Sequence, residues 1–169
     1  GCAGALAHLV ARCPWASNAF VRRQLFPKML LLLDAEAELD PRTCAAVGAT
    51  ISALCANERV TLRTEPSLQL LMCVQSPSVF GASADAERYL GHALVTVAAR
   101  YVDRPQSKQA ISAIVALMRW EGLGKEGMRA LACTLWLLAR QCRVPADHAP
   151  FVQGDALGIL LTAARHHHT

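Results

Sequence analysis

The sequence predicts an all-α protein in which about four helical hairpins lie side by side. Three observations support this fold class. Alanine and leucine, which favour helices, supply much of a composition that is 53% hydrophobic but only 5% aromatic. Apolar residues recur at steps of three and four, which is the spacing of one helix face. The same pattern returns along the chain at intervals in the low forties, as in stacked pairs of helices.

The chain is predicted to form a single domain over residues 1–165. The domain divides into units, and a disordered tail follows it at 166–169. The predicted units are residues 1–38, 39–78, 83–121 and 124–165. Each unit begins with a long helix and continues into a second one.

In the first unit, a helix over residues 3–13 carries Leu6 and Leu9 and ends at Pro14. Pro27 suits the first turn of the next helix, because an N–H is not needed there. This second helix is predicted over 28–37 and is strongly apolar.

The second unit begins at Asp40 and Pro41. The Asp40 side chain can cap a helix, and Pro41 suits the first position of that helix. The predicted helix over 41–56 is followed by a shorter one over 67–74. The stretch 75–83 (QSPSVFGAS) is predicted to be a loop whose Phe80 packs onto the core.

The third unit begins with a helix over 85–102, and Ser107 is predicted to cap the helix after it. Glycines at 122, 124 and 127 separate this unit from the fourth. There, an apolar helix from Met128 is followed by a polar turn and by a last helix that ends at Arg165.

Equivalent apolar pairs in the long helices are spaced 45, 43 and 41 residues apart. These pairs are Leu6 and Leu9, Ile51 and Leu54, Leu94 and Val97, and Leu135 and Leu138. In the second helices, Leu31, Leu71, Leu117 and Leu160 are spaced 40, 46 and 43 residues apart. Because one hairpin cannot bury its own apolar stripe, neighbouring hairpins are expected to cover it. Leu6 and Leu160, in the outermost helices, are then expected to be exposed.

Two segments resemble armadillo repeats in particular. They are ALAHLVA at 5–11 with FVRRQLFPKMLLLL at 20–33, and CTLWLLA at 133–139 with FVQGDALGILL at 151–161, where Gly154 stands between two helices. The middle units match by period alone, and HEAT repeats share that period. The resemblance implies a right-handed α–α superhelix (an armadillo- or HEAT-like solenoid) and a non-enzymatic scaffold that binds a partner along its groove. Peptide-binding members carry a Trp and an Asn four residues apart, whereas Trp136 is followed by Arg140, so that peptide site is not transferred.

Exposed polar side chains along the groove that the second helices are expected to line are the candidate partner contacts. They are Arg22, Arg23, Lys28, Arg63, Lys108, Gln109 and Arg165. Because most of them are basic, we expect a protein or extended peptide of acidic character, with further repeats of the same chain as neighbours. Two alternatives stay open: an architectural part of a cytoskeletal or ciliary assembly, and an RNA-associated helical-repeat protein. The net charge of +4 includes no long run of like charges, which makes a nucleic-acid partner the weaker hypothesis.

The seven cysteines are an odd number and form no C-x-x-C pair, which indicates a reducing, cytoplasmic location. No apolar run approaches the length of a membrane span. The chain starts inside a predicted helix without an initiator Met, so we expect a segment of a longer protein.

No catalytic, cofactor or metal site is predicted. Cys13 with His8 and Cys133 with His92 are thiol–imidazole pairs without a recognisable catalytic signature. Cys142 and His148 lack the second ligand pair that structural zinc needs. The glycines at 122–127 follow no strand, so they do not predict a phosphate-binding loop.

Overall fold

The computed structural model describes residues 2–13, 15, 18–19, 25–34, 39–57, 77–100 and 104–167. All regular secondary structure in these residues is helical, which confirms the predicted all-α class. The helices are α1 (Cys2–Arg12), α3 (Leu25–Asp34), α4 (Pro41–Ala56), α6 (Pro77–Phe80), α7 (Ala84–Arg100), α8 (Arg104–Met118), α9 (Lys125–Gln141), α10 (Pro145–Gln153) and α11 (Ala156–His167). Within these ranges, no helix has the length and apolar character required to cross a membrane.

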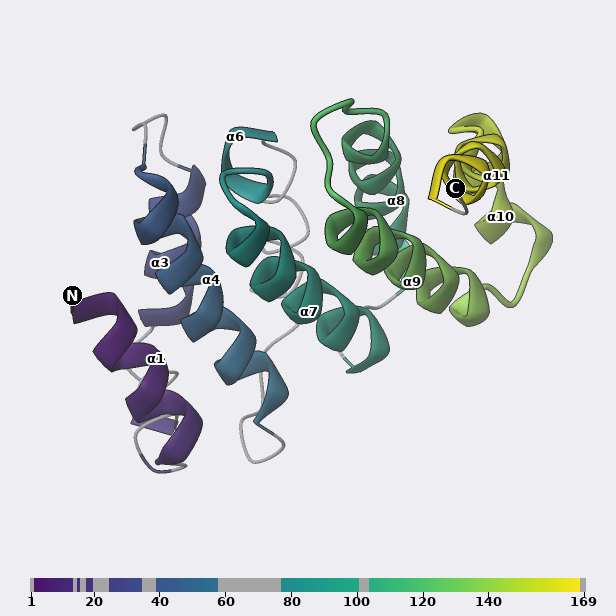
Figure 1. The fold of residues 1–169 in the computed structure, drawn as a ribbon. Helices are drawn as coiled ribbons and strands as arrows, with labels where there is room; N and C mark the ends of the chain where they lie inside the picture. The colour runs from purple at the N-terminus through teal and green to yellow at the C-terminus, as the bar shows by residue number, and fades with distance from the viewer. Residues whose placement is uncertain are drawn as a thin grey trace.

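Helices α1, α4, α7 and α9 lie side by side in chain order, and we call them the front row (Figure 1). A second set of helices packs against this row: α3 contacts α4, α8 contacts α9, and α11 contacts both α8 and α9. The first and last helices therefore lie at opposite ends of the molecule (Figure 1).

Neighbouring front-row helices run in the same direction and in matching register (Figure 1). Hydrogen bonds between them join residues that are 40, 45, 40 and 43 positions apart. The joined residues are Ser52 with His92, Cys55 with Arg100, Glu87 with Gly127, and Ala98 with Gln141. These separations agree with the interval at which the apolar pattern returns in the sequence.

The core lies between the front row and the helices packed against it. The apolar residues predicted to face inward on α4, α7 and α9 are buried: Ile51, Leu54, Leu94, Val97, Leu135 and Leu138. Phe80 is fully buried, as predicted. Leu6 is exposed as expected, whereas Leu160 is half-buried and its neighbours Leu157 and Leu161 are exposed instead.

Helix α4 begins as the sequence predicts. One carboxylate oxygen of Asp40 accepts from the backbone N–H groups of Arg42 and Thr43, at 3.0 and 3.1 Å, and the Thr43 hydroxyl donates to the other. These bonds, led by the one from the Thr43 hydroxyl, lower the pKa of Asp40 below its ordinary value. Pro41 occupies the first turn, where no N–H is needed.

Several predicted helix boundaries are wrong. Helix α8 begins at Arg104 rather than after Ser107, since a proline at 105 is tolerated in a first turn. Helix α9 begins at Lys125 rather than Met128. Residues 145–153 form α10 instead of a turn, because the Asp147 carboxylate accepts from the backbone N–H groups of Arg143 and Val144.

Three further predictions concern a loop, the last helix and the second helix of the second unit. The stretch 75–83 contains the short helix α6, and α11 extends through His167, two residues past the predicted boundary at 165. The helix predicted over 67–74 lies outside the described residues. The division into units stays a prediction.

Candidate partner-binding sites

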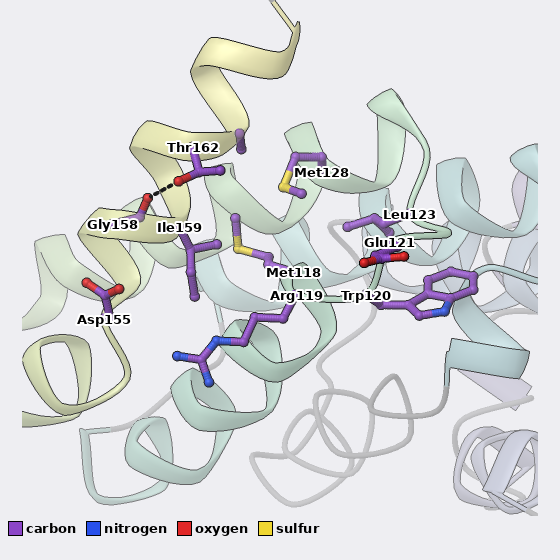
Figure 2. Close-up of a pocket in the computed structure, with 11 residues that line it drawn as sticks. Met118, Arg119, Trp120, Glu121, Leu123, Met128, Asp155, Gly158, Ile159 and Thr162 are labelled. Atoms are coloured by element: carbon purple, nitrogen blue, oxygen red, sulfur yellow. Dashed lines mark hydrogen bonds between the residues drawn. The ribbon is translucent and has the colours of Figure 1, made fainter.

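A pocket of about 580 Å³ opens between the end of α8, the loop after it, the start of α9 and the beginning of α11 (Figure 2). We call it the α8–α11 pocket. Its apolar lining includes Met118, Leu123, Met128 and Ile159, and its polar lining includes Arg119, Glu121, Asp155 and Thr162. The volume lies in the range of ligand-binding pockets, which is about 300 to 1,000 Å³.

A second candidate is the outward side of α7 and α9, away from the core. On α7 the exposed residues Arg88 and His92 are four positions apart, and on α9 the exposed residues Arg129, Trp136 and Arg140 follow at steps of seven and four. These steps place each set on one side of its helix, opposite the buried leucines. We call these five residues the α7–α9 face.

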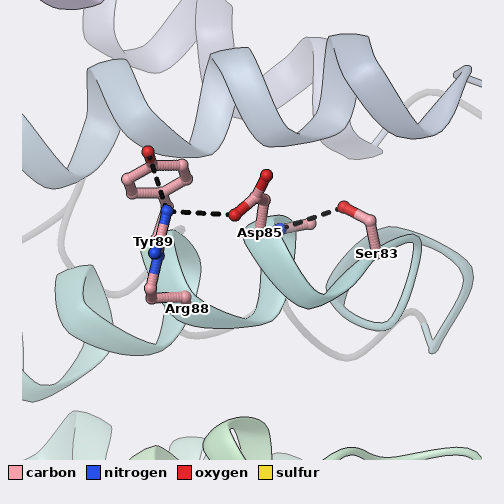
Figure 3. Close-up of polar contacts among 5 residues, drawn as sticks. Ser83, Asp85, Arg88 and Tyr89 are labelled. Atoms are coloured by element: carbon pink, nitrogen blue, oxygen red, sulfur yellow. Dashed lines mark hydrogen bonds and ion pairs between the residues drawn. The ribbon is translucent and has the colours of Figure 1, made fainter.

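The α7 part of this face is held by contacts near the start of the helix (Figure 3). Ser83 caps α7 by accepting from the Ala86 N–H at 3.1 Å. The Arg88 guanidinium donates to Asp85 at 3.0 Å and to the Tyr89 hydroxyl at 3.1 Å, and it lies 4.8 Å from the Tyr89 ring centroid. Because both charged side chains are exposed, the ion pair contributes less than about 1 kcal/mol to stability, and its main effect is to orient Arg88.

The α9 part is built around Trp136, an indole that is 55% exposed. The Arg140 guanidinium lies 4.8 Å from the centre of its ring, so the two side chains stack one helical turn apart. An exposed cation–π contact of this kind is worth about 0.5 to 1 kcal/mol. Trp and Arg are also the residue types that contribute most to binding energy at protein interfaces.

The face is bordered by α4, whose outward positions are small. Ala45, Ala49 and Ala53 are half-buried there. His92 bridges the two helices, since its Nδ1 shares a hydrogen bond of 2.8 Å with the Ser52 hydroxyl. Methyl groups beside a row of arginine and tryptophan leave room for a partner chain to lie across the helices.

Charge is distributed unevenly over the face. The acids Asp85 and Glu126 lie in the first turns of α7 and α9. Arg88 and Arg129 follow one turn later, and Arg140 lies in the last turn of α9. The three arginines outnumber the two acids, so the named groups carry a small net positive charge, which favours an acidic partner.

The structure does not bring the predicted contact residues into one cluster. Lys28 is exposed on α3 and Arg165 is exposed on α11, at opposite ends of the molecule (Figure 1). Lys108 and Gln109 lie in α8, but their side chains are outside the described part. Arg22, Arg23 and Arg63 also fall outside the described residues.

Sequence reasoning missed the α7–α9 face as a site. The step of four from Trp136 to Arg140 is visible in the sequence and is the signal that could have indicated this face. The neighbouring Arg88 and Tyr89 carried no comparable signal, because their stack depends on the local rotamers of both side chains.

Thiol chemistry is not favoured at the buried cysteines. Burial raises the pKa of the Cys55 thiol to about 12, and it also raises the pKa of Cys44. A neutral thiol is a poor nucleophile. His92, which the sequence offered as a partner of Cys133, is bonded to Ser52. Among the described residues, no group of three or more His, Cys, Asp or Glu side chains is arranged to hold a metal ion.

Comparisons with protein-family models, with curated proteins and with solved structures found no match to this chain. The geometry of the α7–α9 face and of the α8–α11 pocket is therefore the basis from which a function can be inferred.

Proposed function

We propose that this chain is an armadillo-like α-solenoid, a right-handed α–α superhelix, that acts as a non-enzymatic scaffold for partner proteins. The front row supports this proposal, because parallel helices in constant register are what stacked repeats produce. Contacts that join residues 40 to 45 positions apart add to it, since armadillo and HEAT repeats have that period.

The α7–α9 face is the observation that carries the proposed binding activity. An exposed Trp136 stacked on Arg140 contributes little to folding, so its large apolar surface remains available to a partner. The arginines around it supply bidentate donors for carboxylates. An acidic protein segment would therefore gain both apolar burial and charge-assisted hydrogen bonds on this face.

Further repeats are proposed to pack on both ends of the row. Large apolar side chains are exposed on α1 and α3 at one end and on α10 and α11 at the other. They are Leu6, Leu9, Leu31, Leu32, Val152, Leu157 and Leu161. A reducing cytoplasmic environment is part of the same proposal, and it is supported by cysteines 13, 44, 55, 133 and 142, which form no disulfide bonds.

The test is a comparison of proteins retained by the immobilised chain, identified by mass spectrometry. Three baits are compared: wild type, the double variant Trp136→Ala/Arg140→Ala, and Val144→Ala. Val144 is an exposed apolar residue just before α10 that belongs to neither proposed surface, so its variant controls for a general loss of surface hydrophobicity. We expect a set of proteins held by wild type and Val144→Ala but reduced at least about tenfold by the double variant.

Salt and nuclease treatment separate this proposal from RNA association. The apolar contacts of Trp136 should keep part of the binding as salt rises to about 0.5 M, although the arginine–carboxylate contacts weaken, whereas phosphate-driven binding falls steeply with salt. Equal retention by all three baits, or loss of the retained proteins after nuclease treatment, would contradict partner binding at the α7–α9 face.

A further inference from the structure

The α8–α11 pocket shares no residue with the α7–α9 face, and its lining has a different character. Met118 is buried and forms the floor, while Met128 and Ile159 are half-buried at its sides (Figure 2). Methionine is flexible and polarizable, so a wall of this kind adapts to aliphatic groups of several shapes.

The polar groups of the pocket offer acceptors more than donors. Arg119 donates to the Gly154 carbonyl at 3.0 Å, and the Thr162 hydroxyl donates to the Gly158 carbonyl at 2.9 Å. Asp155 and Glu121 are both exposed, and each carries a carboxylate. Two carboxylates against one guanidinium that is already bonded to a carbonyl leave the pocket with an excess of negative charge.

The exposure of these polar groups also bears on the kind of ligand. Pockets for small metabolites fix their ligands with a few precisely placed polar groups in a mostly enclosed space. Here Arg119, Glu121, Asp155 and Thr162 are all exposed at the surface, and only the apolar floor is covered. Such a site suits a side chain inserted from a longer molecule whose remainder lies outside the pocket.

We propose that the α8–α11 pocket docks a basic amphipathic segment of a partner protein. An aliphatic side chain of that segment packs against Met118, Met128 and Ile159. Lysine or arginine side chains of the same segment, on either side of it, meet the carboxylates of Glu121 and Asp155, which lie on opposite sides of the pocket (Figure 2). This site goes beyond the proposed function, because it adds a second surface with the opposite charge preference to the α7–α9 face.

The methionines give a direct test. The chain has four, at positions 29, 72, 118 and 128, so methyl labelling with ¹³C yields few NMR signals, two of them from the pocket. The probes are three synthetic peptides: AKLLKALLKA, its acidic counterpart AELLEALLEA, and its polar counterpart AKSSKASSKA. With AKLLKALLKA we expect the Met118 and Met128 signals to shift and saturate, while the signal of the buried Met29 in α3 stays in place.

Variants without the carboxylates of Glu121 and Asp155 test whether peptide binding depends on their charge. Glu121→Gln combined with Asp155→Asn should weaken AKLLKALLKA about tenfold, which corresponds to about 1.4 kcal/mol. Asparagine is chosen because Asp155 has a φ of 53°, a region that asparagine tolerates. The matched control is Glu126→Gln, an exposed acid in the first turn of α9 outside the pocket lining, and it should bind as wild type does.

The acidic and polar peptides should each bind at least about tenfold more weakly than AKLLKALLKA. Equal binding of AELLEALLEA, or no movement of Met118 and Met128 at millimolar peptide, would overturn the proposal. Shifts caused by hexylamine but by none of the peptides would overturn it as well, in favour of a small-molecule site. Trp136→Ala/Arg140→Ala should leave the peptide titration unchanged, so failure here is distinguishable from failure of the α7–α9 face.

Discussion

Glu87 on α7 is only 5% exposed. Its carboxylate has two backbone hydrogen-bond partners at the start of α9. One oxygen accepts from the Gly124 N–H at 3.0 Å and the other from the Gly127 N–H at 3.2 Å. A Cβ atom at Gly124 or Gly127 would lie 2.5 or 2.8 Å from a carboxylate oxygen, so side chains at these positions would prevent the contact. A residue of α7 thus caps the start of α9, where the helix's own N-cap residue has no side chain.

Replacing Glu87 by alanine should lower the free energy of unfolding by about 2 kcal/mol, since two N–H groups lose a buried acceptor. Glu87→Gln should cost less, because the amide keeps one acceptor oxygen. Urea denaturation followed by far-UV circular dichroism measures both variants. Glu126→Ala makes the same chemical change at an exposed site and should cost less than about 0.5 kcal/mol. Equal losses for Glu87→Ala and Glu126→Ala would contradict the capping role.

At the level of the elements, the spacing between α7 and α9 is set by small residues. A Cβ atom on Gly91 would lie 2.5 Å from the Ala130 Cβ, which is closer than two carbon atoms can approach. Gly91 is buried in the middle of α7, and the two helix backbones lie close together there. Larger side chains at this crossing would push the helices apart.

Gly91→Ala should therefore destabilise the protein, although alanine is the better helix former. The steric cost of about 1 to 3 kcal/mol outweighs a propensity gain of about 1 kcal/mol. Adding Ala130→Gly removes the opposing methyl group, so the double variant should return close to wild-type stability. Thermal and urea unfolding of both single variants and the double variant complete the cycle. A double variant that is as unstable as the sum of the single variants would rule out this contact as the cause.

Sequence patterns predicted the helix faces better than the helix ends. Ile51, Leu94 and Leu135 were placed inward by spacing alone, because burial of a helix face follows from local periodicity. The start of α9 was predicted at Met128 and lies at Lys125, because its cap comes from Glu87, 37 residues before Gly124. A cap supplied by another helix leaves no signature in the neighbouring sequence.

The candidate sites were less accessible to sequence reasoning for a related reason. Trp136 and Arg140 form a local pair, but their union with Arg88 on one face depends on the register between α7 and α9. The α8–α11 pocket needs segments around residues 118–128 and 155–163 to meet, and only tertiary packing brings them together.

At the scale of the whole molecule, packing is uneven along the row. Helix α7 contacts both α4 and α9, and its Leu90, Leu94 and Val97 are fully buried. Helix α11 contacts α8, α9 and α10, but its Leu157 is 70% exposed. Local stability should therefore fall from the middle of the row towards this end.

Hydrogen exchange measured by mass spectrometry should show this gradient. Amides in the centre of α7 should exchange at least about tenfold more slowly than amides of α11, since opening α7 disrupts contacts on two sides. Adding a low concentration of urea should accelerate exchange in α11 before it affects α7. Uniform protection along the row would show instead that the helices unfold as one cooperative unit.

The parallel direction of the front row has an electrostatic consequence. Because α4, α7 and α9 point the same way, their peptide dipoles add instead of cancelling, and partial positive charge collects along one edge of the molecule. Acids stand at that edge, with Asp40 at the start of α4, Asp85 at α7 and Glu126 at α9, while Arg100 and Arg140 stand at the opposite edge. The side chains thus offset a polarity that the backbone arrangement creates, with charges of both signs at α7 and α9 and an acid alone at α4.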